Sequence, residues 1–394
     1  MRDTAFIICE YNPFHNGHAL HIRETRVAGA KYVVCVMSGN YVQRGEPAFC
    51  DKQTRAAFAI ENGADLVLEI PLKFVVSGAP RFAEGAINVI RSLNEKGTLS
   101  FGSSADINTL QLLAAFSSDP DILLKANVYS QIHGTTFAYS LHRLILDVFP
   151  EGDGVLQDAN NILASEYIKA IQKCGCDLDL FSVLRVTRHD SDKHESNIAS
   201  GKHIRDLMYA GKSPDLYERF LPENVISLIN TELQKGSLPA DKSKFSVAAM
   251  SRLYLIDEND LRSINGVNQG LENRIIQCLK DTSDLYLLYD AVKTKRFTHA
   301  RIRQILISSV LGIKKEALER PNPYVRVLGM NKKGRALLRH YRQIADVPLI
   351  MNLSEAPECE ERTWDANSSQ LYDLCRPVPF NKSPEYVMKP YVSE

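Results

Sequence analysis

The chain has 394 residues, 44% of them hydrophobic and 24% charged, a composition typical of a globular protein large enough for two or three domains. Its 47 basic and 47 acidic residues give a net charge of zero, which argues against nucleic-acid binding driven by overall charge. No apolar run approaches the roughly 18 residues that cross a bilayer, and the N-terminus lacks the order of a signal peptide. We therefore expect a cytoplasmic protein that does not enter a membrane.

The first half of the chain alternates short β-branched runs with helical patterns, which predicts parallel strands joined by helices. Strands are expected at 6–10, 32–38, 65–71, 98–103 and 179–186, and helices near 17–29, 51–63, 80–95, 106–117, 135–148 and 160–173. This pattern predicts an α/β fold with a doubly wound, five-stranded parallel sheet over residues 1–200. In such sheets ligands bind outside the carboxyl ends of the strands.

Helical periodicity replaces this alternation from about residue 200. Helices are expected near 202–210, 223–234, 244–256, 269–280, 283–293 and 298–311. Residues 201–320 are thus predicted to form a second, mainly helical domain. The last part, 321–394, is predicted to be a mixed segment in which a strand precedes the basic helix of "MNKKGRALLRHYR", and 346–352 is a further strand without an assigned partner.

The sequence "HNGH" (15–18) follows the first strand and the turn "YNPF". Asn12 precedes Pro13, which disfavours helix there, so the helix is expected to begin at Asn16 to Ala19. Two histidines in the first helical turn lie beside unpaired backbone N–H groups and the positive end of the helix dipole, which favours phosphate. Zinc is less favoured, because helical zinc histidines usually lie four residues apart. A purely structural pair is the other alternative.

A basic run, "VKTKRFTHARIRQ" (292–304), carries Lys293, Lys295, Arg296, Arg301 and Arg303 without an acidic residue. These cations are predicted to follow the phosphates of an RNA, with Phe297 or His299 stacking on a base. A solvated basic surface is the alternative reading.

A strand, a turn and HxGH at the first strand-to-helix junction resemble the adenylyl-transferring superfamily, which includes nucleotidylyltransferases and class I aminoacyl-tRNA synthetases. Further segments make the resemblance more specific. Together with "EYNPFHNGH", the segments "VMSGNYVQRGEPA", "DKQTRAAFAIENGADLVLEIP", "SFGS", "NNILASEYIKAI", "GLENRI", "KTKRFTHARIR" and "YVRVLGMNKKGRALL" resemble the bacterial tRNA(Met) cytidine acetate ligase family.

The resemblance implies an enzyme that activates acetate with ATP as acetyl-adenylate and transfers the acetyl group to the wobble cytidine of elongator tRNA(Met). It implies His15 and His18 as catalytic residues. A triphosphate that reacts at its α-phosphorus makes Mg²⁺ the expected companion of ATP, and no acidic pair stands out in the sequence as a protein ligand for a metal. The implied ATP-binding residues are Ile7, Tyr11, Asn12, Pro13, Phe14, His15, Gly17, His18, Gly102, Asn161, Arg188, His189 and Arg205. Asn160 competes with Asn161 for its role, and the block 38–52 is the expected region for acetate.

Some residues depart from the family pattern, notably Ser104 after "FGS", where the family tends to have glutamate, and "ASGKHIR" (199–205). Two other functions therefore stay open. One is a nucleotidylyltransferase acting on a small phosphorylated metabolite, for which the first domain would suffice. The other is a nucleotide- or RNA-binding protein without catalysis. The sequence does not determine the oligomeric state.

Overall fold

The computed structural model describes residues 1–184, 197–268, 270–380 and 382–393. A central sheet contains the five predicted strands, all parallel: β1 (Thr4–Cys9), β2 (Tyr32–Ser38), β5 (Leu66–Ile70), β6 (Gly97–Ser103) and β7 (Leu178–Leu184). Their order is β5-β2-β1-β6-β7, so the chain winds outward from β1 in one direction and then in the other. The predicted doubly wound α/β fold is confirmed, and the switch point lies between β1 and β6.

The sheet is larger than the five strands predicted. It has eight strands because the C-terminal part of the chain adds β8 (Val325–Met330), β9 (Leu349–Ile350) and β10 (Tyr391–Val392). β8 pairs antiparallel with β5, and both β9 and β10 pair with β8. Residues 346–352 thus find the partner that the sequence did not assign. The division of the chain into 1–200, 201–320 and 321–394 remains a prediction.

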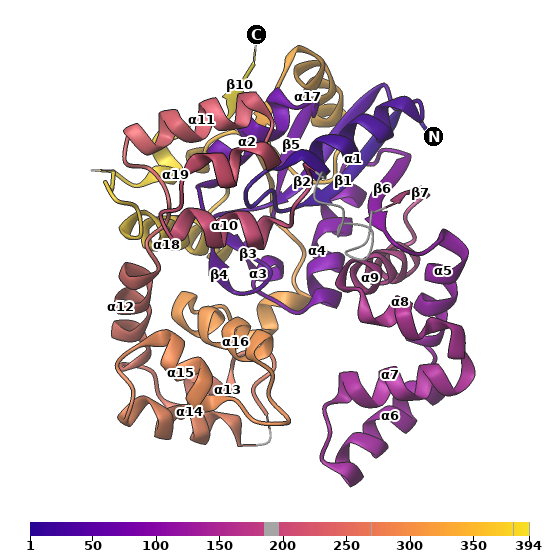
Figure 1. Cartoon of the computed structure of the whole chain (residues 1–394), viewed down its shortest axis with the longest axis vertical. Coiled ribbons are helices and arrows are strands. Elements are labelled where there is room, and N and C mark those ends of the chain that lie inside the picture. The colour runs from indigo at the N-terminus through magenta and orange to yellow at the C-terminus, as the bar shows by residue number, and fades with distance from the viewer. Residues whose placement is uncertain (185–196, 269, 381, 394) are drawn as a thin grey trace.

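Helices cover both faces of the sheet, because its strands are apolar on both sides (Figure 1). In β1, Phe6 packs into one core cluster, while Ala5 and Ile7 pack into the other. The first face is covered by α4 (Ala79–Ser92), α5 (Ile107–Phe116), α9 (Ala159–Cys174) and α17 (Lys332–Ile344). The second is covered by α1 (Asn16–Val27), α2 (Lys52–Glu61), α10 (Gly201–Tyr209) and α11 (Glu223–Gln234).

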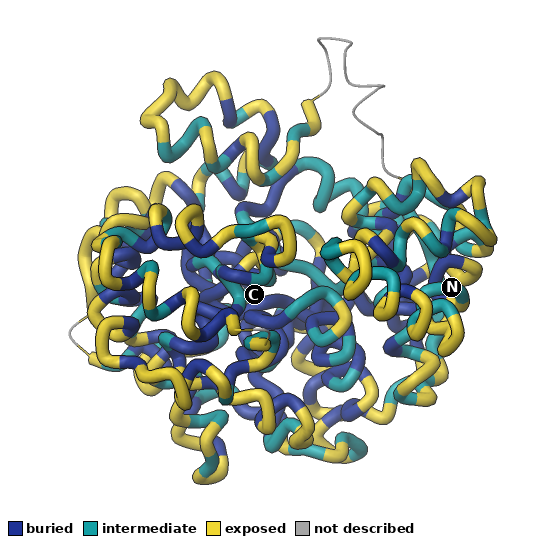
Figure 2. The backbone as a smooth tube through the Cα atoms, turned by 90° about the horizontal axis from the view of Figure 1, so that it is seen from below, coloured by how far each residue is buried: buried dark blue, intermediate teal, exposed yellow. Residues whose placement is uncertain are grey.

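Two helical groups extend away from the sheet in Figure 1. One contains α12 (Lys242–Leu253), α13 (Glu258–Arg262), α14 (Leu271–Lys280), α15 (Leu285–Val292) and α16 (His299–Leu311). The other contains α6 (Pro120–His133), α7 (Phe137–Val148) and α8 (Asp153–Gln157). The sequence predicted neither α6 nor α8. Figure 2 shows the buried residues concentrated towards the middle of the molecule, with exposed residues towards its outside. The α12–α16 group has a buried core of its own side chains, which is continuous with the core of the first face of the sheet.

The remaining elements connect the C-terminal segment to the sheet. They include the hairpin of β3 (Tyr41–Val42) and β4 (Glu46–Pro47), and the helices α3 (Leu72–Val75), α18 (Glu360–Leu374) and α19 (Pro384–Val387). A buried cluster of charges joins them: Lys52 Nζ lies 2.8 Å from both Glu69 Oε2 and Glu385 Oε1, and Arg326 pairs with Glu385 at 2.6 Å. Burial beside these carboxylates raises the pKa of Asp365 to about 7.

Within the described part of the chain, no helix is long and apolar enough to cross a membrane.

Candidate active site

The two histidines of HNGH form the first turn of α1, as the sequence predicted. His15 is the N-cap, and its Nδ1 accepts a hydrogen bond from the backbone N–H of Gly17 at 3.1 Å. Nδ1 of His18 accepts one from the backbone N–H of His15 at 3.2 Å. The two rings stack with centroids 3.6 Å apart. Since each Nδ1 is an acceptor, each neutral ring carries its proton on Nε2, which suits a phosphate oxygen.

Gly17 is closely packed in this turn. A Cβ atom at residue 17 would lie 3.0 Å from Cε1 and 3.1 Å from Nδ1 of His15. A side chain there would therefore displace the His15 ring from its place over the start of the helix by a few tenths of an ångström. Gly17 was predicted only as one of the ATP-binding residues, and this contact gives it a structural role as well.

A second helix begins beside the same turn. Ser200 caps α10, with its Oγ accepting a hydrogen bond from the backbone N–H of His203 at 3.3 Å. A Cβ atom at Gly201 would lie 3.1 Å from the carbonyl oxygen of Asn12, and Arg205 donates a hydrogen bond to that same oxygen. Two positive helix ends thus meet at the carboxyl end of β1. Lys202 forms an ion pair with Asp206 at 2.6 Å.

The wall opposite α1 is built by β6 and the start of α9. Asn161 is 1% exposed, and its amide holds Ser104 through the backbone N–H at 3.0 Å and Oγ at 2.9 Å. Ser104 Oγ also donates to Asp158 at 2.8 Å. Asn160, one residue earlier, lines the cleft instead. Asn161 therefore braces the wall from behind, whereas Asn160 lines the cleft.

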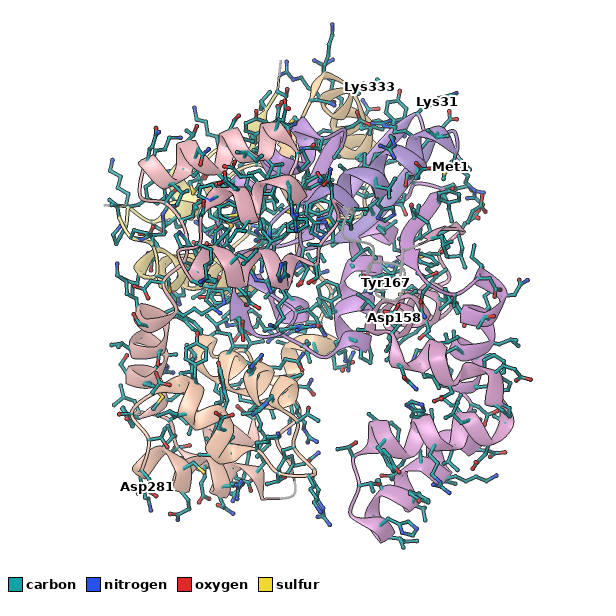
Figure 3. All side chains as sticks on the ribbon, viewed as in Figure 1. Met1, Lys31, Asp158, Tyr167, Asp281 and Lys333 are labelled. Atoms are coloured by element: carbon teal, nitrogen blue, oxygen red, sulfur yellow. The ribbon has the colours of Figure 1, made fainter. Side chains whose placement is uncertain are left out.

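These elements surround a cleft of about 1670 Å³. A typical small-ligand pocket encloses roughly 300–1,000 Å³, so the cleft has room for a nucleotide and a second group. Figure 3 labels two of the lining residues, Asp158, which caps the N-terminus of α9, and Tyr167 within that helix. Of the residues that the sequence analysis selected, those that line the cleft are Ile7, Tyr11, Asn12, His15, Gly17, His18, Gly102, Arg205 and Arg303.

Other selected residues lie elsewhere. Phe14 is fully buried and packs against the rings of Tyr11 and His18, and Pro13 is buried in the same turn. Both shape the turn from behind the cleft. Arg188 and His189 lie outside the described residues.

Glu10 is a cleft residue that the sequence analysis did not select. It follows β1, and its Oε1 accepts a hydrogen bond from the backbone N–H of Gln43 at 2.6 Å. Burial raises the pKa of its carboxyl group, while the Gln43 bond and the charges of Arg55, Arg205 and Arg44 oppose this shift. Its position at the carboxyl end of the first strand was the signal that could have identified it.

The cleft continues from Glu10 towards the helices α10, α12, α15 and α16. This far half is lined by Arg44 and Glu46 of the hairpin, Tyr209, Lys242, Tyr286 and Arg303. Arg303 Nη1 lies 3.0 Å from Glu46 Oε1, and Lys242 Nζ lies 4.6 Å from the centre of the Tyr209 ring. No motif in the sequence connects these residues, because they come from five separate segments.

The predicted RNA-binding cations do not form one surface. Lys293, Lys295 and Arg296 are exposed, whereas Arg303 faces the cleft. Arg301 donates to the carbonyl oxygen of Gly266 at 2.6 Å.

The two aromatic residues of the basic run differ in their accessibility. Phe297 is 7% exposed beneath the guanidinium of Arg301, so the prediction that its ring stacks on a base is wrong. His299 is partly exposed, and its Nε2 lies 2.9 Å from Asp290 Oδ1.

Comparison with known proteins agrees with this geometry. Residues 1–385 match the family model described as HIGH Nucleotidyl Transferase. The tRNA(Met) cytidine acetate ligase of Thermoanaerobacter sp. (strain X514) is 35% identical over 89% of both chains, and that of Clostridium perfringens (strain ATCC 13124) is 31% identical over 98% of both. The crystal structure of Thermotoga maritima TmcAL bound with alpha-thio ATP superposes with a TM-score of 0.90, at 29% identity over 99% of both chains. The chain therefore belongs to the HIGH nucleotidyl transferase family and, within it, to the tRNA(Met) cytidine acetate ligases.

Proposed function

We propose that this protein uses ATP to activate acetate and transfers the acetyl group to the exocyclic amine of the wobble cytidine in elongator tRNA(Met). The observation that carries the proposal is the stacked His15–His18 pair at the start of α1, inside a cleft with room for two substrates. The similarity over nearly the whole chain to tRNA(Met) cytidine acetate ligases, and to a relative bound with an ATP analogue, supports it.

In the first step an acetate oxygen attacks the α-phosphorus of ATP. A new P–O bond forms, the bond to the β-phosphate oxygen breaks, and pyrophosphate leaves. The Nε2–H groups of His15 and His18 donate hydrogen bonds to the phosphate oxygens as negative charge develops. The N-terminus of α1 stabilises the same charge.

In the second step the cytidine amine attacks the carbonyl carbon of acetyl-adenylate. A C–N bond forms, the C–O bond to the phosphate breaks, AMP leaves and the amine loses a proton. Because the adenylate is already reactive, the protein's main task is to bring the two groups together.

Mg²⁺ fits this proposal as a companion of ATP rather than as an ion held by the protein. Four carboxylates line the cleft in the described part of the chain, and each has a partner. Glu10 accepts from the Gln43 N–H, Asp158 accepts from Ser104, Glu46 pairs with Arg303, and Asp206 pairs with Lys202. Among the described residues, no group of three or more His, Cys, Asp or Glu side chains is arranged to hold a metal ion. Mg²⁺ bound to the phosphate oxygens of ATP would neutralise part of the negative charge of the triphosphate.

We assign the exposed Lys293, Lys295 and Arg296 to contacts with the tRNA backbone, and we expect the reaction to take place in the cytoplasm, where tRNA is found. Incubation of the protein with ATP, acetate and tRNA should yield AMP, pyrophosphate and acetylcytidine. AMP formation that requires neither acetate nor tRNA would refute the proposal. If the protein binds ATP but does not turn it over, the alternative of a nucleotide- or RNA-binding protein without catalysis is favoured.

A further inference from the structure

The far half of the cleft contains an ion pair that is open to the cleft on one side. Arg303 of α16 and Glu46 of β4 form a contact of 3.0 Å, and their side chains remain 28% and 24% exposed. Gly45, beside Glu46, has a φ of +75°, and a Cβ atom there would lie 2.9 Å from the backbone of Arg303. The hairpin is therefore fitted closely against α16, and the ion pair is held at a fixed place.

Two polar atoms at this place, one in Arg303 itself and one in the neighbouring Tyr286, lack a hydrogen-bond partner. Among the described residues, Nε of Arg303 and the hydroxyl oxygen of Tyr286 are buried and accept or donate no hydrogen bond. Buried polar atoms are nearly always paired in folded proteins, because an unpaired one forfeits its hydrogen bonds to water. Two of the unpaired atoms in the described part of the chain therefore lie in the wall of one cleft, where a small side-chain movement would let a bound ligand supply the missing partners.

Aromatic rings accompany these polar groups. The ring of Tyr209, which α10 brings into the cleft, is already covered by the Lys242 ammonium group at 4.6 Å. Tyr286 packs edge-on against Tyr289, with ring centroids 5.7 Å apart. Aromatic rings are the features that proteins use to hold an unstacked base of a single-stranded RNA.

The hydrogen-bonding edge of cytosine matches the ion pair. Its exocyclic amine donates to a carboxylate such as Glu46, while its ring nitrogen and carbonyl oxygen accept from a guanidinium such as Arg303. Uracil would place a carbonyl oxygen against Glu46 and an N–H against Arg303. The same pair of side chains therefore selects cytosine and rejects uracil.

This half of the cleft adjoins the ATP half. The Gln43 backbone N–H, on the hairpin that carries Glu46, binds Glu10 at the end of β1. Helix α10 also joins the two halves. Its Arg205 donates to the carbonyl oxygen of Asn12, and its Tyr209, one turn later, lines the far half of the cleft. A base held beside Glu46 would thus lie next to the region where the adenylate forms.

We infer that Glu46, Arg303, Tyr209 and Tyr286 form the pocket for the acceptor cytosine, a site that rests on the function proposed above. Arg303 then contacts a base rather than the phosphates that the sequence analysis assigned to it. Glu46 accepts one hydrogen of the amine and so directs its nitrogen towards the acetyl carbon.

The test separates the two half-reactions. Acetate-dependent exchange of pyrophosphate into ATP needs no RNA, whereas acetyl transfer needs the tRNA. In E46Q, R303K and Y286F we expect the ratio of transfer to exchange to fall by about 10- to 100-fold. R303K keeps a cation beside Glu46 but removes the Nε–H. Two controls should leave the ratio unchanged: E258Q, which alters an exposed Glu–Arg pair also at 3.0 Å, and Y32F, at the opposite end of the strands.

A competition experiment tests the specificity. A tRNA with uridine at the wobble position should inhibit wild-type transfer weakly, and E46Q should narrow the difference between the cytidine and uridine forms, because glutamine can donate to the uracil oxygen. Equal losses of exchange and transfer, or an unaltered ratio in all three variants, would overturn the inference. If the wild-type protein shows no acetate-dependent exchange, the proposed function itself fails and the pocket assignment falls with it.

Discussion

The substitution Gly17→Ala tests the link between the packing of the first turn of α1 and its chemistry. The added Cβ atom would lie 3.0 Å from His15 Cε1, whereas ordinary Cβ contacts begin at 3.4 Å, so the ring must move by about 0.4 Å. That movement disturbs the 3.6 Å stack with His18 and lengthens the bond from the Gly17 N–H.

We expect a loss of activity without a large loss of stability. Alanine favours a helix over glycine by about 0.5–1 kcal/mol, and the weakened cap costs a similar amount, so the melting temperature should change little. A misplacement of about 1 Å in a catalytic group can cost roughly 100-fold. For about 0.4 Å we expect acetate-dependent pyrophosphate exchange to fall roughly 10-fold.

The assay pairs exchange kinetics with thermal unfolding. Gly78→Ala is the control, because a Cβ atom there meets its nearest neighbours at 3.8 Å and 4.0 Å. If Gly17→Ala keeps full exchange activity, the argument that glycine sets the position of His15 is wrong. If the variant unfolds many degrees below the wild type, the main role of Gly17 is to stabilise the fold, and the loss of activity does not report on the position of His15.

Three further results are expected. His18→Ala should lower exchange by about 100-fold through the loss of one phosphate donor, and kinetics at saturating ATP measure this. Replacing Lys293, Lys295 and Arg296 together by alanine should weaken tRNA binding and lower the slope of log affinity against log salt by about 2, whereas an unaltered slope would remove them from the interface. Asp365 has its folded pKa raised to about 7, so its contribution to stability is full below its unfolded pKa and is lost as pH rises through 7. Asp365→Asn should therefore be more stable than the wild type at pH 8 by about 1–3 kcal/mol, with a smaller difference near pH 5, as measured by denaturant unfolding.

Rules based on neighbouring residues predicted those parts of the site that depend on short stretches of sequence. The turn after β1, the start of α1 and the alternation of strands and helices depend on residues a few positions apart, and the structure confirms them. The asparagine pair shows the limit of such rules. Both Asn160 and Asn161 lie in the first turn of α9, and only tertiary contact with Ser104 turns Asn161 away from the cleft.

Contacts between distant segments could not be predicted. β8 pairs with β5 across more than 250 residues, and no periodicity encodes that partner. α6 was missed although Leu124, Val128 and Ile132 are spaced four residues apart and share one face of the helix. In the structure that apolar face is exposed, while Ala126 is buried. The Glu46–Arg303 pair joins two segments that have no motif in common.

The antiparallel pairing of β8 with β5 has a consequence for how the chain matures. β5 is complete by Ile70, but the strand that covers its open edge begins only at Val325. During synthesis on the ribosome the apolar edge of β5 would stay unpaired until most of the chain has been made, and such edges invite pairing with other chains. The last seventy residues thus act as an internal cover for the nascent sheet, and a fragment ending near residue 320 should aggregate even though it contains every strand of the nucleotide cleft.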